Sequence, residues 1–195
     1  MNIGIDIDGV LTDLENYIGT VGKEYTIRNG LGFDDTMNIN TTYGFLRKED
    51  SHQFWNTHWE NYATTIKVRK DASNIIKKLK MNGNKIIIIT ARTYDSQIIK
   101  DGKKRQKNME KLIMKWLDKN DIKYDKIVFS NLNKLKDCLD NKIDIMIEDS
   151  ISNIEQLKDN MKMLCFNAKY NSFYINSQVD RVYSWNDVYN IISKI

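Results

Sequence analysis

Short apolar runs rich in isoleucine recur along this chain, each separated from the next by a stretch with helical periodicity. The clearest run is 85–90, where four consecutive isoleucines are followed by a threonine. An apolar run of this length is typical of a strand that is covered on both faces. Helices that alternate with such strands predict an α/β fold, namely a Rossmann-like, mostly parallel sheet with helices on both faces and right-handed crossovers.

The same periodicities assign an element to most of the chain. The expected strands cover residues 2–7, 85–90, 126–129, 143–147, 162–166 and, as an edge strand, 181–184. The expected helices cover residues 71–82, 109–117, 132–140, 151–159 and 186–195. We expect Asp71 to cap the first of these helices, which ends before Gly83. Ligands of such sheets bind beyond the carboxyl ends of the strands, so candidate functional residues are sought there.

Residues 14–68 interrupt this alternation. They contain several glycines and many aromatic residues, but no run as apolar as the predicted strands. We interpret them as a small, mainly helical cap inserted after the first strand, with residues 1–13 and 69–195 forming the core domain. A chain of 195 residues is long enough for one domain with such an insertion.

Composition narrows the classes of function. No apolar run approaches the roughly 20 residues that span a bilayer, and two acids interrupt the apolar start, so we expect a cytoplasmic protein without a signal peptide or a membrane partner. The net charge of +4 suits an anionic ligand but is too small to indicate a stable nucleic-acid complex. Cys138 and Cys165 lie in apolar segments, which favours buried thiols over a disulfide or a metal cluster.

Two acidic pairs stand at the ends of predicted strands. Asp6 and Asp8 lie in the motif DIDGVLTD after the first strand, and Glu148 and Asp149 follow a later one. If these strands are parallel neighbours, four carboxylates converge at one edge, where a hard cation such as Mg²⁺ would relieve their repulsion. A calcium EF-hand does not fit, because leucine and tyrosine occupy the positions of its glycine and glutamate. Asp149 alone would also suit a helix cap.

A hydroxyl and an ammonium group are expected at the same edge. Thr90 ends the isoleucine strand, and Lys134 opens the helix before the second acidic pair. Such groups bind phosphoryl oxygens and neutralise the charge that develops in phosphoryl transfer. Lys136 is an alternative to Lys134, because a small shift in register exchanges the two. Arg92 is a candidate contact for a substrate phosphate or carboxylate, and equally for an acid of the cap.

Taken in order, DIDGVLTD, IIIIT, the lysine near position 134 and IMIEDS resemble the four motifs of the haloacid dehalogenase superfamily. The resemblance spans nearly the whole chain and implies a phosphomonoester hydrolase. It implies that Asp6 attacks phosphorus and forms an aspartyl phosphate, while Asp8 protonates the leaving oxygen and then activates water. By the same resemblance, Thr90 and Lys134 would hold the phosphoryl group.

The resemblance also implies a metal cofactor, Mg²⁺. Its ligands would be the Asp6 carboxylate, the Asp8 backbone carbonyl and Asp149, with Glu148 acting through water. His52 and His58 lie in the predicted cap without a third ligand nearby, so we do not expect them to bind zinc.

The short chain, the DxDGV start and the insertion after it are most similar to the 5′(3′)-deoxyribonucleotidase family and its bacterial nucleotidase relatives. In that family, aromatic side chains of the cap form a base pocket. The candidates in this sequence are Phe45, Phe54, Trp55, Trp59 and Tyr62. The alternative, of about equal weight, is that the rings at helical spacing are the cap's own core.

The expected function is therefore a monophosphatase for a small phosphorylated metabolite, with a (deoxy)nucleoside monophosphate as the leading substrate. A sugar phosphate, another small phosphometabolite or a phosphorylated polymer end is the alternative substrate. A non-catalytic phosphate-binding module is the third hypothesis, disfavoured because all four motifs are intact. A homodimer is compatible with the sequence.

Overall fold

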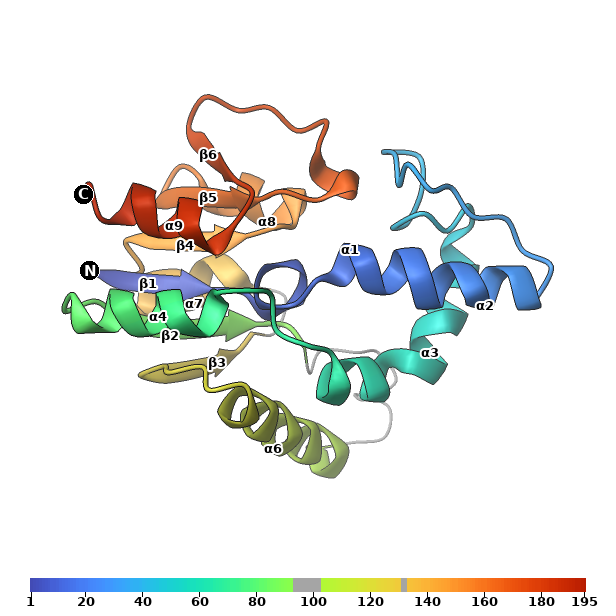
Figure 1. Cartoon of the computed structure of the whole chain (residues 1–195), viewed down its shortest axis with the longest axis horizontal. Coiled ribbons are helices and arrows are strands. Elements are labelled where there is room, and N and C mark those ends of the chain that lie inside the picture. Colours follow the sequence, from blue (N-terminus) through green and yellow to red (C-terminus); the bar gives the residue numbers. More distant parts are fainter. Residues whose placement is uncertain (93–102, 131–132) are drawn as a thin grey trace.

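The computed structural model describes residues 1–92, 103–130 and 133–195, with side chains of the helix that opens at Lys103 described from Asn108 onward. In the described chain, six parallel strands form one sheet in the order β3-β2-β1-β4-β5-β6 (Figure 1). The strands are β1 (Asn2–Ile5), β2 (Lys85–Thr90), β3 (Lys126–Phe129), β4 (Ile145–Glu148), β5 (Lys162–Phe166) and β6 (Val179–Val182). Because all are parallel, their carboxyl ends share one edge.

Helices cover both faces of this sheet (Figure 1). One face packs against α4 (Ala72–Met81), α6 (Lys103–Lys119) and α9 (Trp185–Ile192), and the other against α7 (Lys134–Asp140) and α8 (Ile151–Leu157). The isoleucine strand shows why both faces are apolar: Ile86 and Ile88 join the first cluster, while Ile87 and Ile89 join the second. The predicted α/β class, with a two-sided parallel sheet, is confirmed.

The strands on which the acidic pairs stand end at different residues from those predicted. β1 ends at Ile5 rather than at residue 7, because the chain turns over Ile7–Leu11, where the Thr12 N–H donates to the Ile7 carbonyl at 3.0 Å. The turn stays buried, so its apolar residues extend the pattern past the strand. β4 ends one residue later than predicted and includes Glu148.

The last strand and helix are also shifted. β6 lies two residues earlier than predicted, and α9 begins at Trp185. The Ser184 hydroxyl accepts from the Asp187 N–H at 3.2 Å, and the Asp187 carboxylate accepts from the Tyr183 N–H at 3.0 Å, which ends the strand and starts the helix. Asp71 occupies the predicted N-cap position of α4, but its φ is 64° and its side chain makes no capping bond within the described chain.

Between β1 and β2 the chain forms a separate group of helices beyond the acidic edge of the sheet (Figure 1). They are α1 (Leu14–Tyr17), α2 (Lys23–Arg28) and α3 (Lys48–Thr65). Their own apolar cluster contains Leu14, Ile18, Met37, Phe45, Phe54 and Tyr62. An antiparallel bridge between Thr12 and Val68 closes the base of the insertion. We therefore propose residues 14–68 as the cap.

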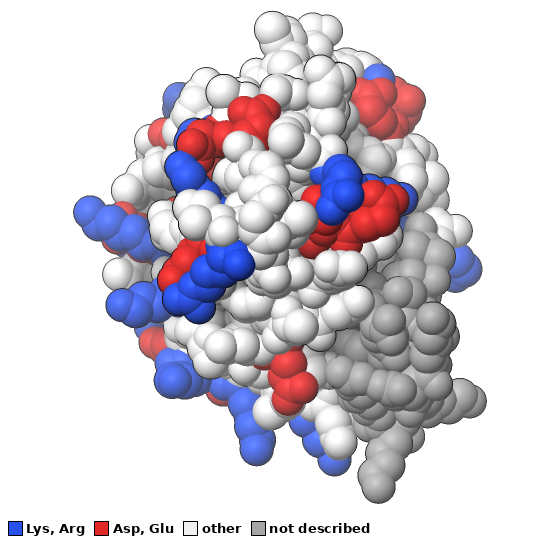
Figure 2. All heavy atoms as spheres, turned by 90° about the vertical axis from the view of Figure 1, so that its right-hand side faces the viewer, with Lys and Arg blue, Asp and Glu red and all other residues white. Residues whose placement is uncertain are grey.

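The outer end of the cap carries charges of both signs. Figure 2 shows basic and acidic groups in small mixed clusters on this face. Within the cap, ion pairs join Lys23 to Asp35, Arg28 to Glu24 and Arg47 to Asp50. Interspersed charges of this kind differ from the basic stripe that nucleic-acid binding needs. None of the described helices has the length and apolar character to cross a membrane.

Candidate active site

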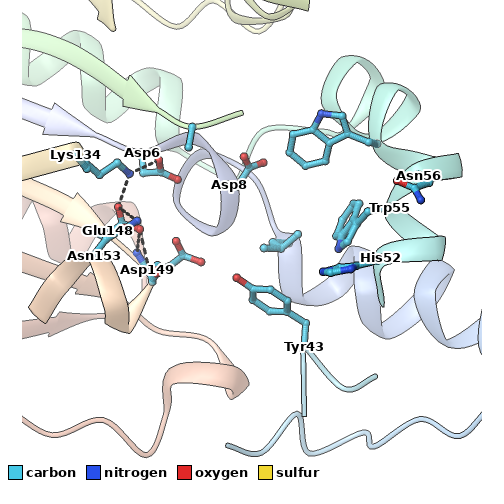
Figure 3. A pocket seen from close by; sticks show the side chains of 14 residues that line it. Asp6, Asp8, Tyr43, His52, Trp55, Asn56, Lys134, Glu148, Asp149 and Asn153 are labelled. Atoms are coloured by element: carbon cyan, nitrogen blue, oxygen red, sulfur yellow. Dashed lines mark hydrogen bonds and ion pairs between the residues drawn. The ribbon is translucent and has the colours of Figure 1, made fainter. Parts of the chain in front are cut away.

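Three of the four carboxylates predicted to converge, those of Asp6, Glu148 and Asp149, meet at one edge of the sheet, while Asp8 lines the adjoining cavity and pairs with Arg92. Asp6 follows β1 and Glu148 ends the adjacent β4, and the Asp6 N–H donates to the Ile147 carbonyl at 3.1 Å. One carboxylate oxygen from each of Asp6, Glu148 and Asp149 lies within 4.8 Å of the others. All three side chains are buried. Strand adjacency therefore builds a compact set of oxygen ligands (Figure 3).

Lys134 is the cation of this cluster. Its Nζ donates to Asp6 Oδ1 at 2.7 Å and to Glu148 Oε2 at 2.5 Å, and the residue is only 4% exposed. It is placed at the start of α7, where the Asn133 side chain accepts from the Lys136 N–H at 3.0 Å and caps the helix. Lys136 is exposed and pairs with Asp140 on the surface. The geometry therefore favours Lys134 over Lys136 as the phosphate-site lysine.

The cluster holds more negative charge than one ammonium group neutralises. Burial raises the pKa of Asp6 to about 7, with the Glu148 and Asp8 charges adding to this effect and Lys134 opposing it. Burial, reinforced by Glu148 and Asp6, also raises the pKa of Asp149 well above its ordinary value. Burial alone would lower the pKa of Lys134, but Asp6 and Glu148 raise it. An all-oxygen cluster of this charge fits a hard divalent cation.

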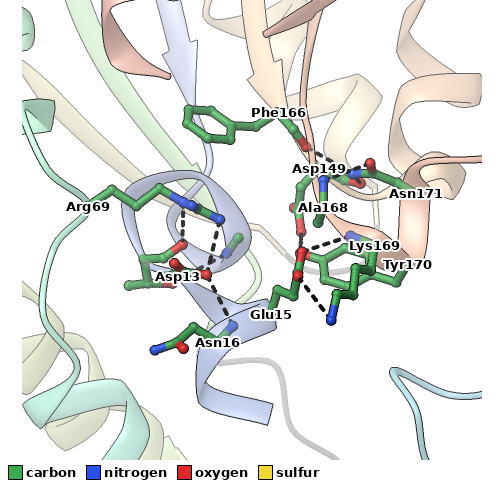
Figure 4. Close-up of polar contacts among 12 residues, drawn as sticks. Asp13, Glu15, Asn16, Arg69, Asp149, Phe166, Ala168, Lys169, Tyr170 and Asn171 are labelled. Carbon is green, nitrogen blue, oxygen red and sulfur yellow. Dashed lines mark hydrogen bonds and ion pairs between the residues drawn. The ribbon is translucent and has the colours of Figure 1, made fainter. Parts of the chain in front are cut away.

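The turn after β1 leaves room for the Asp149 carboxylate. Gly9 has a φ of +78°, and a Cβ at this position would lie 1.9 Å from Asp149 Oδ2. The Tyr170 hydroxyl donates to the same oxygen at 2.5 Å, and Asn171 Nδ2 donates to the Asp149 carbonyl at 2.8 Å (Figure 4). Neither residue was predicted from the sequence, because nothing in the sequence of their turn (Lys169–Asn171) links it to the acidic edge.

Thr90 ends β2, as predicted, and Arg92 follows it two residues later. Thr90 is fully buried at the end of β2, and its hydroxyl accepts from the Arg92 N–H at 3.1 Å, while the next residue, Ala91, lines the cavity. Within the described chain Arg92 does not pair with an acid of the cap, and it is not among the residues that line the cavity. It is 1% exposed and donates to Asp8 Oδ1 through Nε at 3.0 Å and Nη2 at 2.8 Å. The contact of Arg92 with substrate stays a prediction, which its burial against Asp8 does not favour.

A cavity of about 490 Å³ lies between the acidic edge and the cap. Its core side includes Asp6, Asp8, Lys134, Glu148 and Asp149, and its cap side includes Leu14, Tyr43, His52, Trp55, Asn56 and Trp59 (Figure 3). Apolar rings thus face carboxylates across the space. An opening of this volume suits a small-molecule ligand with one charged end.

Some of the predicted aromatic residues of the cap line the cavity, and others form the apolar core of the cap. Trp55 and Trp59 line the cavity, as does Tyr43, which was not predicted from the sequence. Phe45 does not: it is 0% exposed, packs edge-on against Phe33, and belongs to the apolar cluster of the cap. Its predicted contact with substrate is wrong, because the irregular stretch before α3 folds its ring inward. Phe54 and Tyr62 of the same cluster are also fully buried.

Solved structures identify the fold. A haloacid dehalogenase family hydrolase from Deinococcus radiodurans, solved with phosphate and sodium, matches with a TM-score of 0.66 at 14% identity, covering 99% of this chain and 95% of that one. A hydrolase of the same superfamily from Geobacter sulfurreducens matches with a TM-score of 0.58 at 11% identity, covering 97% and 98%. At these identities the likeness establishes the fold, which is that of the haloacid dehalogenase superfamily.

Sequence comparison identifies the family. The model of the family described as "5' nucleotidase, deoxy (Pyrimidine), cytosolic type C protein" matches residues 1–195, so the chain belongs to this family. A nucleotidase of Clostridium acetobutylicum is 27% identical over 203 residues, which cover 100% of this chain and 95% of the relative. The chain is thus an enzyme of the phosphatase and nucleotidase class, and the predicted resemblance is confirmed.

Proposed function

We propose that this enzyme hydrolyses (deoxy)nucleoside monophosphates with the help of Mg²⁺, through an aspartyl phosphate on Asp6. The observation that carries the proposal is the position of buried Asp6, bonded to Lys134, at the floor of a cavity whose opposite wall is aromatic. Membership of a nucleotidase family and the Clostridium nucleotidase support this substrate class. The phosphate found with the Deinococcus hydrolase supports a phosphoryl site in this fold.

The proposed reaction uses two aspartates in turn. The Asp6 carboxylate attacks phosphorus as the bond from phosphorus to the ester oxygen breaks, and Asp8 gives its proton to that leaving oxygen. Asp8 then takes a proton from a water molecule that attacks the aspartyl phosphate, which releases inorganic phosphate and restores the Asp6 carboxylate. Lys134 neutralises charge on the phosphoryl oxygens and favours the ionised, nucleophilic form of Asp6.

The residues present fit a magnesium ion. The proposed ligands are the Asp6 carboxylate, the Asp8 backbone carbonyl and Asp149, with Glu148 acting through water. These donors are oxygens, and Gly9 gives Asp149 room beside the Asp6 turn. When bound, Mg²⁺ would stabilise the negative charge that builds up during phosphoryl transfer.

A panel of phosphate monoesters tests the proposal. The purified enzyme is assayed on nucleoside monophosphates, sugar phosphates and an aryl phosphate, with Mg²⁺, with a chelator, and with Mg²⁺ restored after chelation. We expect turnover that requires Mg²⁺ and is highest on a nucleoside monophosphate. The absence of turnover on every ester, the aryl phosphate included, would contradict the proposal, and a preference for sugar phosphates would contradict its substrate class.

Removal of the Trp55 ring tests the base-binding part of the proposal. Stacking on an aromatic side chain contributes about 1–3 kcal/mol per base, so Trp55→Ala is expected to raise KM for a nucleoside monophosphate about tenfold. KM for a sugar phosphate should stay within about twofold of its value in the unmodified enzyme, because a sugar phosphate has no base to stack. Phe45→Leu is the matched control: its ring is buried in the cap, so stability falls but the ratio of the two KM values stays. Equal effects of Trp55→Ala on both substrates would exclude stacking.

Gly9→Ala tests the close approach of Asp149 to the turn. The added methyl group would overlap Asp149 Oδ2, so the carboxylate must move, and we expect affinity for Mg²⁺ to fall about 10–100-fold. Activity titrated with Mg²⁺ measures this change. Gly83→Ala is the control: Gly83 has a similar φ of +82° with no atom within 4 Å of a built Cβ, so only about 1–2 kcal/mol of backbone strain is expected. An unchanged Mg²⁺ titration for Gly9→Ala would show that Asp149 does not hold the ion in this position.

A further inference from the structure

Arg92 is a fully buried cation in direct contact with the proposed acid. Its Nε and Nη2 donate to Asp8 Oδ1 at 3.0 and 2.8 Å, and its Nη1 donates to the Ala63 carbonyl at 3.1 Å. The guanidinium carbon lies 5.0 Å from the ring centroids of both Tyr62 and Trp116. Two rings and two oxygen acceptors therefore hold the side chain in one place.

This arrangement keeps Arg92 charged and rigid. Burial by itself lowers the pKa of Arg92, but the charge of Asp8 raises it above its ordinary value. A guanidinium group tolerates burial when aromatic faces and anionic oxygens replace its water, and its planar fork fixes the direction of each bond. A buried, immobile fork can fix the orientation of the carboxylate that it binds.

The same side chain joins three parts of the molecule. Asp8 belongs to the turn after β1, Trp116 to α6, and Ala63 to the last turn of cap helix α3. Carbonyl groups in the last turn of a helix lack intrahelical donors, and a cation there interacts favourably with the helix dipole. A second link runs beside it, because the Tyr62 hydroxyl lies 2.7 Å from Thr12 Oγ1. The end of α3 is thus fastened to the turn that carries Asp8.

We propose that Arg92 is a positioning residue, which orients the Asp8 carboxylate for proton transfer and couples that orientation to the seating of cap helix α3 on the core. The two donors of Arg92 that reach Asp8, Nε and Nη2, both contact Oδ1. Oδ2 is therefore the oxygen that gives a proton to the leaving group and later accepts one from water. Oδ1 accepts these two bonds whether or not Oδ2 is protonated, and the arginine keeps its place through the cycle. The inference rests on the proposed function, which gives Asp8 its acid and base role.

The dependence on the leaving group tests this role. The value of kcat/KM reports the steps up to cleavage of the ester, so it isolates the protonation of the leaving oxygen from the later hydrolysis. For Arg92→Met we expect kcat/KM on a nucleoside 5′-monophosphate to fall about 10²-fold. On 4-nitrophenyl phosphate, whose leaving group departs without a proton, we expect a fall of less than about fivefold. A merely structural role would lower both values alike.

Arg69 supplies a matched control. Its guanidinium carbon lies 4.7 Å from the centroid of the Phe166 ring, and its Nε donates to the Thr12 carbonyl at 3.0 Å, so Arg69 too contacts an aromatic ring and a backbone carbonyl (Figure 4). Its acidic partner is Asp13, at 3.4 Å, rather than Asp8. Arg69→Met is therefore expected to lower stability while leaving the ratio of the two kcat/KM values unchanged.

A double-mutant cycle with Asp8→Asn completes the experiment. In that background no acid remains to be positioned, so adding Arg92→Met should lower kcat/KM on the nucleotide by less than about threefold. Equal losses on the two substrates, or a full additional loss in the Asp8→Asn background, would overturn the inference. If thermal unfolding shows that Arg92→Met is unfolded at the assay temperature, Arg92→Lys replaces it, because lysine keeps the charge but lacks the planar guanidinium group. The same two tests then apply, namely the ratio of the losses on the two substrates and the additional loss in the Asp8→Asn background. An unmodified enzyme without turnover on either ester would instead overturn the proposed function, and the inference with it.

Discussion

Asp6→Asn is expected to lower turnover by about 10⁴-fold or more while the protein stays folded. An amide cannot attack phosphorus to form the covalent intermediate, and the groups that hold the phosphoryl oxygens cannot replace that step. The side chain of asparagine has nearly the same shape, and it removes one of three crowded carboxylates. Steady-state turnover measures the loss, thermal unfolding checks the fold, and the mass of acid-quenched enzyme shows whether a phosphorylated protein forms.

Asp13→Asn is the control for this experiment. Asp13 belongs to the same motif, but its side chain accepts from the Asn16 N–H at 3.1 Å and caps α1. Asparagine is an equally good cap, so activity and stability should stay close to those of the unmodified protein. Full turnover by Asp6→Asn, or a phosphorylated form of that variant, would show that another residue is the nucleophile.

Lys134→Met is expected to damage both activity and stability. Loss of the ammonium group leaves the buried carboxylates of Asp6 and Glu148 without their cation, which costs about 3–5 kcal/mol when a buried pair loses one partner. Turnover should fall at least about 10²-fold, because the proposed phosphoryl site loses its positive charge. Urea unfolding without Mg²⁺ measures the stability change, since a bound dication would itself offset part of the repulsion.

Lys136→Met separates the two lysines that the sequence left as alternatives. Lys136 is exposed and pairs with Asp140 one turn along α7, so its loss should change stability by less than about 0.5 kcal/mol. Activity should remain near that of the unmodified enzyme. A larger loss of activity in Lys136→Met than in Lys134→Met would reverse the assignment.

The sheet and the acidic cluster were predictable because they depend on repeating or local patterns. The isoleucines of β2 are apolar on both faces, which indicates a covered parallel strand, and Asp6 and Glu148 each stand at a strand end. Once β1 and β4 are neighbours in a parallel sheet, these acids must meet. Lys134 was predictable to within two residues, because it opens a helix whose start the periodicity marks only approximately.

Other parts of the site depend on packing between distant segments. The direction of the Arg92 side chain is set by Tyr62 and Trp116, and neither contact has a sequence pattern. Tyr170 reaches Asp149 from a turn beyond the next strand. In the cap, helical spacing of aromatic rings did not separate Trp55, which lines the cavity, from Phe54, which is buried. Which ring faces the cavity is decided only by how the cap docks on the core.

The central place of β1 affects how the enzyme matures during synthesis. Its partners in the sheet are β2 and β4, at residues 85–88 and 145–147, which leave the ribosome long after β1 itself. Contacts so far apart in the chain form slowly, and until they form the apolar first strand has both edges unpaired. Asp6 is thus translated before Glu148 and Asp149 and gains these two acidic neighbours only after β4 has emerged, so the acidic cluster forms late in the nascent chain.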